Sequence, residues 1–294
     1  MELTIGMATY DDFEGVYFTV QALRLYQGIE DAEILVVDNY GCEMTRTFVE
    51  EWTPARYVLA NEVQGSGPAK NRVFEEAQGA IVVACDSHVL LAPGVIGRLR
   101  EFYRDHPDCD DLLQGPLLYD DLVSLSTHFA PEWRTSMWGT WATDPRGLSV
   151  DMEPFDIPMQ GLGAFSCRKS AWLGFNPRFR GFGGEEGYIH EKFRQAGRRT
   201  LCLPWFLWTH RFVRPGGVPY ANTLEDRLHN YIVGHAELGL ELAPIVNHFA
   251  ESLPEETVAR VTAGALWEDF GTEGRGADGT GRNGANGRQS RPSN

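Results

Sequence analysis

The stretch Ile81 to Leu91 (IVVACDSHVLL) carries Asp86, Ser87 and His88, and these three residues have the types and spacing that best suit chemistry. A short apolar run after a polar turn predicts a buried strand of a parallel sheet. Ligands of such sheets bind just beyond the carboxyl ends of the strands, where residues two apart point to the same side. A carboxylate and an imidazole so placed predict a divalent metal site, whose mixed oxygen and nitrogen donors suit Mn²⁺ better than Ca²⁺.

The same residues have an alternative interpretation as a helix cap, because Asp and Ser often open a helix after a strand. The residues after His88 are apolar and lead to Pro93 and Gly94, so the predicted helix begins later, near Pro93. Taken alone, the triplet leaves both interpretations open, and the rest of the chain must decide between them.

The first half of the chain alternates strand and helix patterns. Strands are predicted at residues 2–8, 32–38 and 55–60 and from Ile81 on, with helices at 14–26, 43–51 and 67–77. This alternation predicts an α/β fold, Rossmann-like, with a central and mostly parallel sheet flanked by helices on both faces.

The second half is less regular. Residues 107–158 are predicted as an irregular loop whose tryptophans, Trp133, Trp138 and Trp141, either pack on the core or form a stacking platform for a sugar or another flat ligand. The later patterns predict a strand in GAFSCRK, a helix at 185–196 ended by Gly197, an edge strand at 199–205 and helices at 224–242 and 255–270. Residues 271–294 are dense in Gly, Asn, Arg and Ser, which predicts a disordered tail.

The composition of the chain excludes some classes of function and location. A net charge of −15 argues against nucleic acid as the main partner, although a nucleotide bound with its own cation is compatible with an acidic surface. Five scattered cysteines predict free thiols in a reducing compartment. No apolar run is long enough to span a membrane, and a first strand near residue 2 leaves no room for a signal peptide, so a cytoplasmic location is expected.

Polar residues follow the other predicted strands as well. Thr9, Tyr10 and Asp11 follow the first strand, Asp38 and Asn39 follow the second, and His210 lies in a loop after a late strand. Loops after successive parallel strands converge on one rim of the sheet. Polar residues at three strand ends on one rim favour a ligand site over a helix cap.

The motifs around these residues resemble those of glycosyltransferases with the GT-A fold, close to family 2 and to the polypeptide N-acetylgalactosaminyltransferases. TIGMATYDD resembles the first strand and its Thr-Tyr turn, and VVDNYG resembles the motif VVDDGS. ANEVQGSGPAKNRVFEEAQGAIVVACDSH resembles the Gly-rich turn, the Ala-Arg-Asn helix start and the DxD strand, and GFGGEEGYIHEKFRQAG resembles the WGGE-(D/N) block. The matching residues run from about Thr4 to Phe212, and four motifs in the family's order form a specific signal.

The resemblance implies a donor site for a nucleotide sugar, with UDP as the expected nucleotide. In the DxH form of the N-acetylgalactosaminyltransferases, the ligands of a divalent metal would be Asp86, His88 and, in WTHRF, His210, with Mn²⁺ preferred and Mg²⁺ possible. Asp38 would contact the base. The other residues expected to bind the donor are Thr9, Tyr10, Asp11, Lys70 (where the family usually has Arg), Asn71, Ser87, Arg211 and Arg214. Residues 1–106 would then form the nucleotide-sugar-binding half, and residues 107–270 the acceptor-binding and catalytic half.

Two adjacent acids depart from the closest pattern. By resemblance, inverting members carry a base at the position of Glu186, whereas the retaining N-acetylgalactosaminyltransferases carry an amide there. We therefore predict Glu186 as the base of an inverting transfer, with Glu185, Gly183, Gly184 and the tryptophan loop positioning sugar and acceptor. Retention stays an alternative, and so does a purely structural role, because acids are favoured in the first turn of a helix.

Two other classes of protein are weighed. A nucleotidyltransferase usually has a basic, Gly-rich loop after its first strand, and ATYDDFEG has no Lys or Arg. A non-catalytic sugar-binding module would not need the metal motif or the acid pair. The acceptor is left open among glycans, proteins, lipids and small molecules.

Overall fold

The structure is a computed structural model that describes residues 2–213 and 217–270. Arg214 and the predicted disordered tail at 271–294 lie outside the described residues. Among the described residues, no helix is both long and apolar enough to cross a bilayer.

The centre of the molecule is an eight-stranded sheet in the order β11-β13-β6-β12-β4-β1-β2-β3. Strands β3, β2, β1 and β4 run parallel, β12 and β11 are antiparallel to their neighbours, and β13 is parallel to β6. This confirms the α/β class with a mostly parallel sheet. The strands are β1 (Leu3–Thr9), β2 (Glu33–Asp38), β3 (Arg56–Leu59), β4 (Ile81–Asp86), β6 (Leu112–Gln114), β11 (Phe155–Asp156), β12 (Ala164–Arg168) and β13 (Thr200–Cys202).

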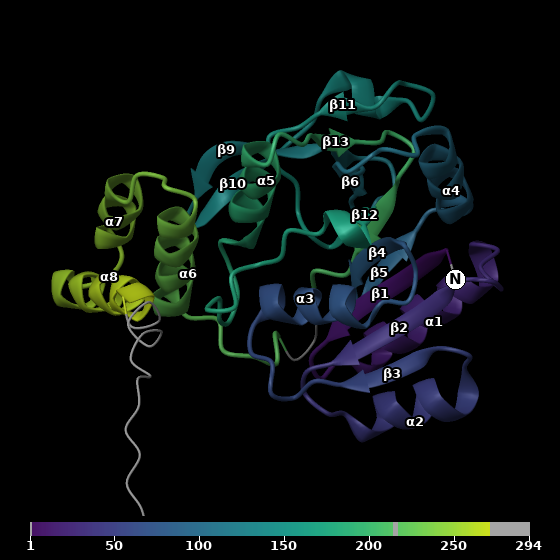
Figure 1. Ribbon diagram of the computed structural model, residues 1–294, viewed down its shortest axis with the longest axis horizontal. Coiled ribbons are helices and arrows are strands. Elements are labelled where there is room, and N and C mark those ends of the chain that lie inside the picture. The colour runs from purple at the N-terminus through teal and green to yellow at the C-terminus, as the bar shows by residue number, and fades with distance from the viewer. Residues whose placement is uncertain (1, 214–216, 271–294) are drawn as a thin grey trace, which may run out of the picture.

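Helices cover both faces of this sheet (Figure 1). Alternate β4 side chains pack on opposite layers, with Val83 in one cluster and Val82 in the other, which is why the strand reads as a continuous apolar run. One face packs on α1 (Phe13–Tyr26), α2 (Glu43–Trp52) and α4 (Val95–Asp105). The other packs on α3 (Ser66–Glu76) and α5 (Glu185–Gln195).

The stretch from Ile81 to Leu91 is two strands, not one. After β4 the chain turns at Ser87 and His88 and enters β5 (Val89–Leu91), which belongs to a second, four-stranded sheet. That sheet has the order β5-β14-β7-β8, with β14 (Trp208–His210), β7 (Leu117–Leu118) and β8 (Leu125–Ser126). His210 is therefore the last residue of a strand and not a loop residue.

The prediction of an irregular loop at 107–158 is wrong, because that segment contains a hairpin as well as β6 to β8, β11 and a 3₁₀ turn at Pro145–Leu148. The hairpin strands are β9 (His128–Arg134) and β10 (Met137–Ala142). The sequence pattern did not predict this hairpin, because Pro131 and Gly139 are not typical of a strand interior. Gly139 lies where the pairing register shifts. The strand predicted at the edge, β13, is covered by β11 and is not an edge.

The C-terminal helices group beside the hairpin, away from β1 to β3 (Figure 1). They are α6 (Leu224–Glu237), α7 (Ala243–Ala250) and α8 (Glu255–Phe270). The helix predicted through residue 242 stops early because Gly239, at φ 66°, takes the left-handed conformation that ends helices. A further 3₁₀ turn, Lys169–Ala171, follows β12.

Candidate functional site

A cavity of about 410 Å³ opens at the carboxyl ends of β1 and β4. The chain leaves β1 towards β2 and β3 on one side and returns to β4 on the other, so no crossover fills the space between these two strand ends. In the register of the pair, Ala8 lies beside Asp86. Sheet topology therefore places the residues after β1 and those after β4 around one cavity.

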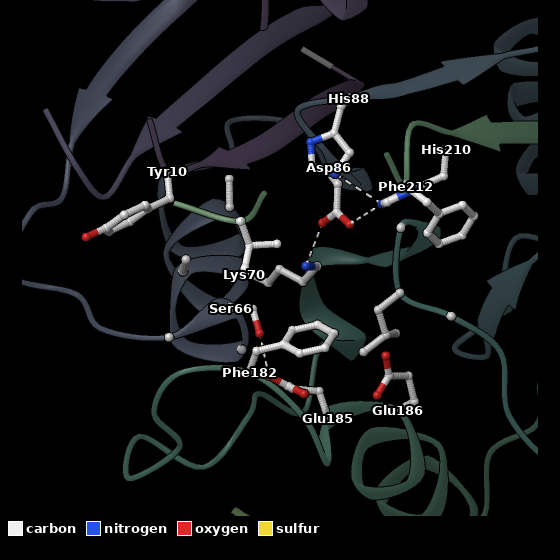
Figure 2. A pocket seen from close by; sticks show the side chains of 18 of the residues that line it. Tyr10, Ser66, Lys70, Asp86, His88, Phe182, Glu185, Glu186, His210 and Phe212 are labelled. Carbon is white, nitrogen blue, oxygen red and sulfur yellow. Dashed lines mark hydrogen bonds and ion pairs between the residues drawn. The ribbon is translucent and has the colours of Figure 1, made fainter. Parts of the chain in front are cut away.

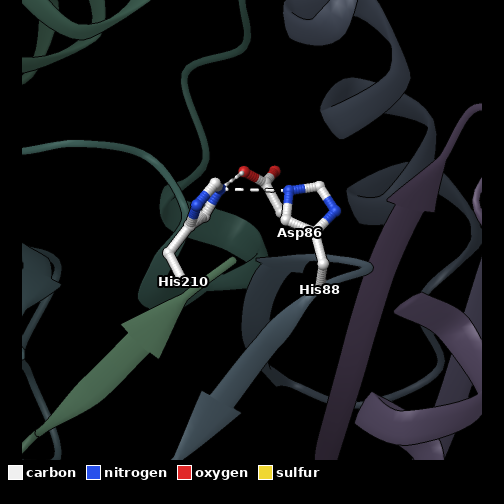
Figure 3. Close-up of side chains that lie close together, drawn as sticks. All are labelled: Asp86, His88 and His210. Carbon is white, nitrogen blue, oxygen red and sulfur yellow. Dashed lines mark hydrogen bonds and ion pairs between the residues drawn. The ribbon is translucent and has the colours of Figure 1, made fainter. Parts of the chain in front are cut away.

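Asp86, His88 and His210 form a cluster in which one donor atom from each residue lies within 4.8 Å of the others (Figure 3). His88 Nε2 is 3.1 Å from His210 Nε2, and His210 Nε2 is 3.3 Å from Asp86 Oδ2. His210 lies 124 positions after Asp86 in the sequence, and the pairing of β14 with β5 brings it next to Asp86 and His88. In that antiparallel pair His210 lies beside Val89, and the Arg211 amide donates to the His88 carbonyl at 3.1 Å.

The donors of this cluster fit a divalent transition metal. Two imidazole nitrogens and a carboxylate oxygen converge, and a partner of the other ring nitrogen fixes the orientation of one imidazole. That partner is Asp12, whose Oδ2 lies 2.8 Å from His88 Nδ1. His210 differs, because its Nδ1 is buried and has no hydrogen-bond partner among the described residues.

Buried Lys70 and half-buried Asp86 form an ion pair, with Nζ 2.8 Å from Oδ1 (Figure 2). Burial opposes ionisation of both groups. Lys70, helped by His210 and His88, nevertheless holds the pKa of Asp86 well below its usual range, and Asp86 keeps the pKa of Lys70 above its usual value. Asp86 therefore faces the cluster as a carboxylate.

Glu185 and Glu186 lie across the cavity from the histidines, in the first turn of α5 (Figure 2). Both Glu185 oxygens are engaged, one by the Ser66 hydroxyl and the other by the Gly183 amide at 2.7 Å. Burial raises the pKa of Glu185 in spite of these donors. For Glu186, burial and then the charge of Glu185 raise the pKa to about 7. Both acids therefore line the cavity, but the Glu185 oxygens are occupied by protein donors, whereas Glu186 has a pKa of about 7.

The structure brings most of the predicted site residues to the cavity wall. Besides the residues just described, these are Thr9, Tyr10, Ser87, Trp138, Trp141 and Arg211. Tyr10 makes ring contacts with Tyr40 and Tyr220 at centroid distances of 5.1 and 6.0 Å.

Six predicted residues do not line the cavity. Asp38 is fully buried, and its carboxylate accepts from the amides of residues 40–42 and from the Tyr57 hydroxyl at 2.8–2.9 Å, so it organises the turn after β2. Asn71 bonds Phe175 and the Trp172 indole. The remaining four are Asp11, Trp133, Gly183 and Gly184.

Trp133 is a packing residue. Its ring stacks on His248 of α7 at 3.8 Å and 8° and meets Tyr231 of α6 edge to face. The Tyr231 hydroxyl also accepts from the Trp138 amide at 2.7 Å. The hairpin is thus fastened to the C-terminal helices through Trp133 and presents Trp138 and Trp141 to the cavity.

Sequence reasoning missed several lining residues. They are Asp12, Ser66, Phe129, Arg134, Phe182, Phe212 and Tyr220, whereas Asn39, which follows the second strand, was expected at this rim and does line the cavity. A signal existed for Asp12, because an acid immediately before an apolar helix is typical of an N-cap. The aromatic residues lie in loops or in the unpredicted hairpin and carried no such signal.

The family model of glycosyl transferase family 2 matches residues 4–169, more than half of the chain. No curated protein matches the chain in sequence.

Several solved structures share the fold. GalNAc-T7, with UDP, GalNAc and Mn²⁺, aligns at a TM-score of 0.67 and 15% identity over 92% of this chain and 57% of its own. TarS of S. aureus with UDP-GlcNAc aligns at a TM-score of 0.54 and 14% identity, over 92% of this chain and 73% of the TarS chain. The mannosyltransferase PcManGT of Pyrobaculum calidifontis, with GDP-Man and Mn²⁺, aligns at a TM-score of 0.52 and 15% identity. The alignment covers 92% of this chain and 75% of the PcManGT chain. At such identities the likeness shows the fold, and this chain spans less than two thirds of the GalNAc-T7 chain.

Proposed function

The chain belongs to glycosyl transferase family 2, and we propose that it moves a sugar from a nucleotide sugar to an acceptor hydroxyl group. The observation that carries this proposal is a single cavity with two chemically different walls. The Asp86–His88–His210 cluster lies on one wall, and Glu186, whose pKa is raised to about 7, lies on the other. A leaving diphosphate needs positive charge on one side of the anomeric carbon, and an attacking hydroxyl needs a base on the other.

On the donor wall, Asp86, His88 and His210 would hold a divalent cation. When bound, the cation would supply positive charge next to the diphosphate of the donor. Lys70 and Arg211, which also line the cavity, would add charge from the protein itself. Tyr10, with Tyr40 and Tyr220 in contact with it, offers aromatic surface to the nucleotide base. We favour UDP and Mn²⁺ because structures of the same fold hold UDP, UDP-GlcNAc or Mn²⁺, although one holds GDP-Man.

On the acceptor wall, Glu186 would take the proton of the acceptor hydroxyl as its oxygen attacks the anomeric carbon and the bond to the diphosphate breaks. This step inverts the anomeric configuration. Glu185 is already engaged by Ser66 and Gly183, so we propose a positioning role for it. Trp138 and Trp141 would bind sugar or acceptor rings.

In this scheme residues 1–106 supply most of the donor wall and residues 107–270 most of the acceptor wall. The strongly negative net charge disfavours a nucleic acid acceptor, and the acceptor class stays open among glycans, proteins, lipids and small molecules. The cytoplasmic location stays a prediction from the five cysteines, which are free thiols in the structure.

A donor-hydrolysis screen tests the proposal. The protein is incubated with UDP-, GDP- and dTDP-sugars and with Mn²⁺ or Mg²⁺, in parallel with His88→Ala. We expect slow, metal-dependent release of one nucleoside diphosphate that the variant loses. Pyrophosphate release from nucleoside triphosphates would point instead to nucleotidyl transfer, and silence with every donor together with absent metal binding would refute the proposal.

The stereochemistry needs a second measurement. With an acceptor in hand, NMR of the first-formed product reads its anomeric configuration directly. The configuration opposite to that of the donor is expected, and retained configuration would remove Glu186 from the role of base.

A further inference from the structure

Asp12, which sequence reasoning did not select, contacts three separate segments of the chain: the start of α1, the turn at Ser87 and His88, and Arg211. It is the N-cap of α1, and its Oδ1 accepts from the Gly15 amide at 3.3 Å. Its Oδ2 lies 2.8 Å from His88 Nδ1 and 3.2 Å from the Ser87 hydroxyl, and its Oδ1 lies 2.5 Å from an Arg211 nitrogen. The residue is only 5% exposed. A buried carboxylate with this many donors is stable as an anion and can only accept hydrogen bonds.

These contacts fix the tautomer of His88. Because the Asp12 carboxylate accepts, the proton of a neutral His88 imidazole must be on Nδ1, and Nε2 then carries the lone pair. Nε2 is the atom that faces His210 Nε2 at 3.1 Å within the cluster. With the opposite tautomer, an N–H group would point to the place where a metal ligand needs a lone pair.

The same helix also holds the backbone on both sides of His88. The Thr19 hydroxyl lies 2.9 Å from the Ser87 carbonyl and 3.0 Å from the Val89 carbonyl. Helix α1 approaches the turn so closely that a Cβ on Gly15 would come within 2.7 Å of the Ser87 carbonyl oxygen. The first two turns of α1 therefore set the position of the His88 backbone, and Asp12 sets the orientation of its ring.

Through Arg211, Asp12 is also tied to the segment that carries His210. The His210 ring has no comparable partner, since its Nδ1 makes no hydrogen bond within the described part of the chain. The influence of Asp12 is thus direct on one histidine of the cluster and only through the backbone on the other.

We propose that Asp12 is a positioning residue that holds His88 in the Nδ1–H tautomer, with Nε2 directed at the cluster with Asp86 and His210. The proposal rests on the proposed metal-dependent function, but its test is on metal binding and on the imidazole itself. Partners of this kind, behind a metal-bound histidine, typically change metal affinity by about 10- to 100-fold.

The first experiment measures Mn²⁺ affinity by calorimetry, with and without UDP, for the full chain, Asp12→Asn and the control Glu14→Gln. Asn is as good an N-cap as Asp, so the helix start is kept while the anionic acceptor is lost. Glu14→Gln removes an exposed carboxylate from the first turn of the same helix. We expect affinity about 10- to 100-fold weaker in Asp12→Asn and unchanged in Glu14→Gln.

The second experiment reads the tautomer in the metal-free protein by ¹⁵N NMR of labelled histidines at pH 8, with the His88 signals assigned from His88→Ala. The measurement on the parent alone already tests the inference and requires no folded Asp12 variant. We expect the proton of His88 on Nδ1 in the parent and a shift towards Nε2–H in Asp12→Asn. A purely structural role of Asp12 would lower the metal-free melting temperature without moving this signature.

Three outcomes would overturn the inference. A parent His88 protonated on Nε2 contradicts it directly. Equal Mn²⁺ affinity of parent and a folded Asp12→Asn refutes the role of Asp12 while the proposed function stands. A parent that binds no Mn²⁺ with or without UDP removes the metal site and the role of Asp12 with it, whereas the proposed sugar transfer is judged separately by the donor-hydrolysis screen.

Discussion

Lys70 Nζ lies 2.8 Å from Asp86 Oδ1, so a buried ammonium occupies one oxygen of the carboxylate whose other oxygen faces His210. The carboxylate is thus shared between a fixed cation of the protein and the candidate metal site. This sharing sets both the charge of the donor wall and the ligand strength of Asp86.

Replacing Lys70 with Met should tighten Mn²⁺ binding about tenfold, because a positive charge close to the cluster is removed. The same change should lower the free energy of unfolding without metal by about 1–3 kcal/mol, since Asp86 loses its partner while staying largely buried. Calorimetry measures the first effect and urea unfolding in EDTA the second. Lys169→Met, which removes an ammonium bound to the Glu75 and Ala77 carbonyls away from the cavity, serves as the control for Mn²⁺ binding. Weaker Mn²⁺ binding in Lys70→Met would show that the ammonium helps to build the site.

Replacing Glu186 with Gln should lower kcat by about 10²- to 10⁴-fold with little change in donor KM, because a general base is lost and donor contacts are kept. Steady-state assays with the donor from the hydrolysis screen measure both constants. Glu191→Gln, on the same helix but in a surface ion pair with Arg194, should behave like the parent. Undiminished turnover in Glu186→Gln would remove this residue as the base.

The rate of transfer should rise with pH through about 7 and then level off, because Glu186 accepts a proton only in its ionised form. Measurement of kcat between pH 5 and 9 tests this. The rise should be absent from the residual activity of Glu186→Gln. A flat profile in the parent contradicts the assignment.

Glu186 also predicts how stability depends on pH. Its folded-state pKa is raised above the usual value, so the folded chain binds its proton more tightly than the unfolded chain does. The contribution of this group is therefore fully present below its unfolded pKa, near 4.3, and is lost as pH rises through about 7. Melting temperatures of parent and Glu186→Gln should diverge in favour of the variant between pH 5 and 8. A constant difference across that range would contradict the raised pKa.

Trp133→Ala and Trp141→Ala should separate packing from ligand binding. Trp133→Ala removes the stack on His248 and should lower the free energy of unfolding by about 2–3 kcal/mol. Trp141→Ala should cost less stability and act mainly on KM, because its ring lines the cavity. Urea unfolding and steady-state assays measure the two effects. Equal stability losses with no change in KM would refute a binding role for Trp141.

The sequence by itself determined the layers of the fold. Apolar runs such as residues 81–85 are stable only when both faces of the strand are buried. Because such strands alternate with amphipathic helices, few arrangements besides a parallel sheet are possible. Local signals also located the acid pair and the DxH triplet, because strand ends and helix first turns are encoded by neighbouring residues. The hairpin at 128–142 escaped because Pro131 and Gly139 interrupt its pattern, and the pairing that stabilises it is not local.

Only the tertiary structure decided which polar residues meet. His210 joins His88 through the pairing of β5 with β14, a contact between segments more than a hundred residues apart. Asp38 turned inward to hold its own turn, whereas Asp12, an unremarked helix cap in the sequence, reached the histidine. Whether a side chain faces a cavity or its own backbone depends on which donors the folded chain brings within about 3 Å, and residue type and spacing do not contain that information.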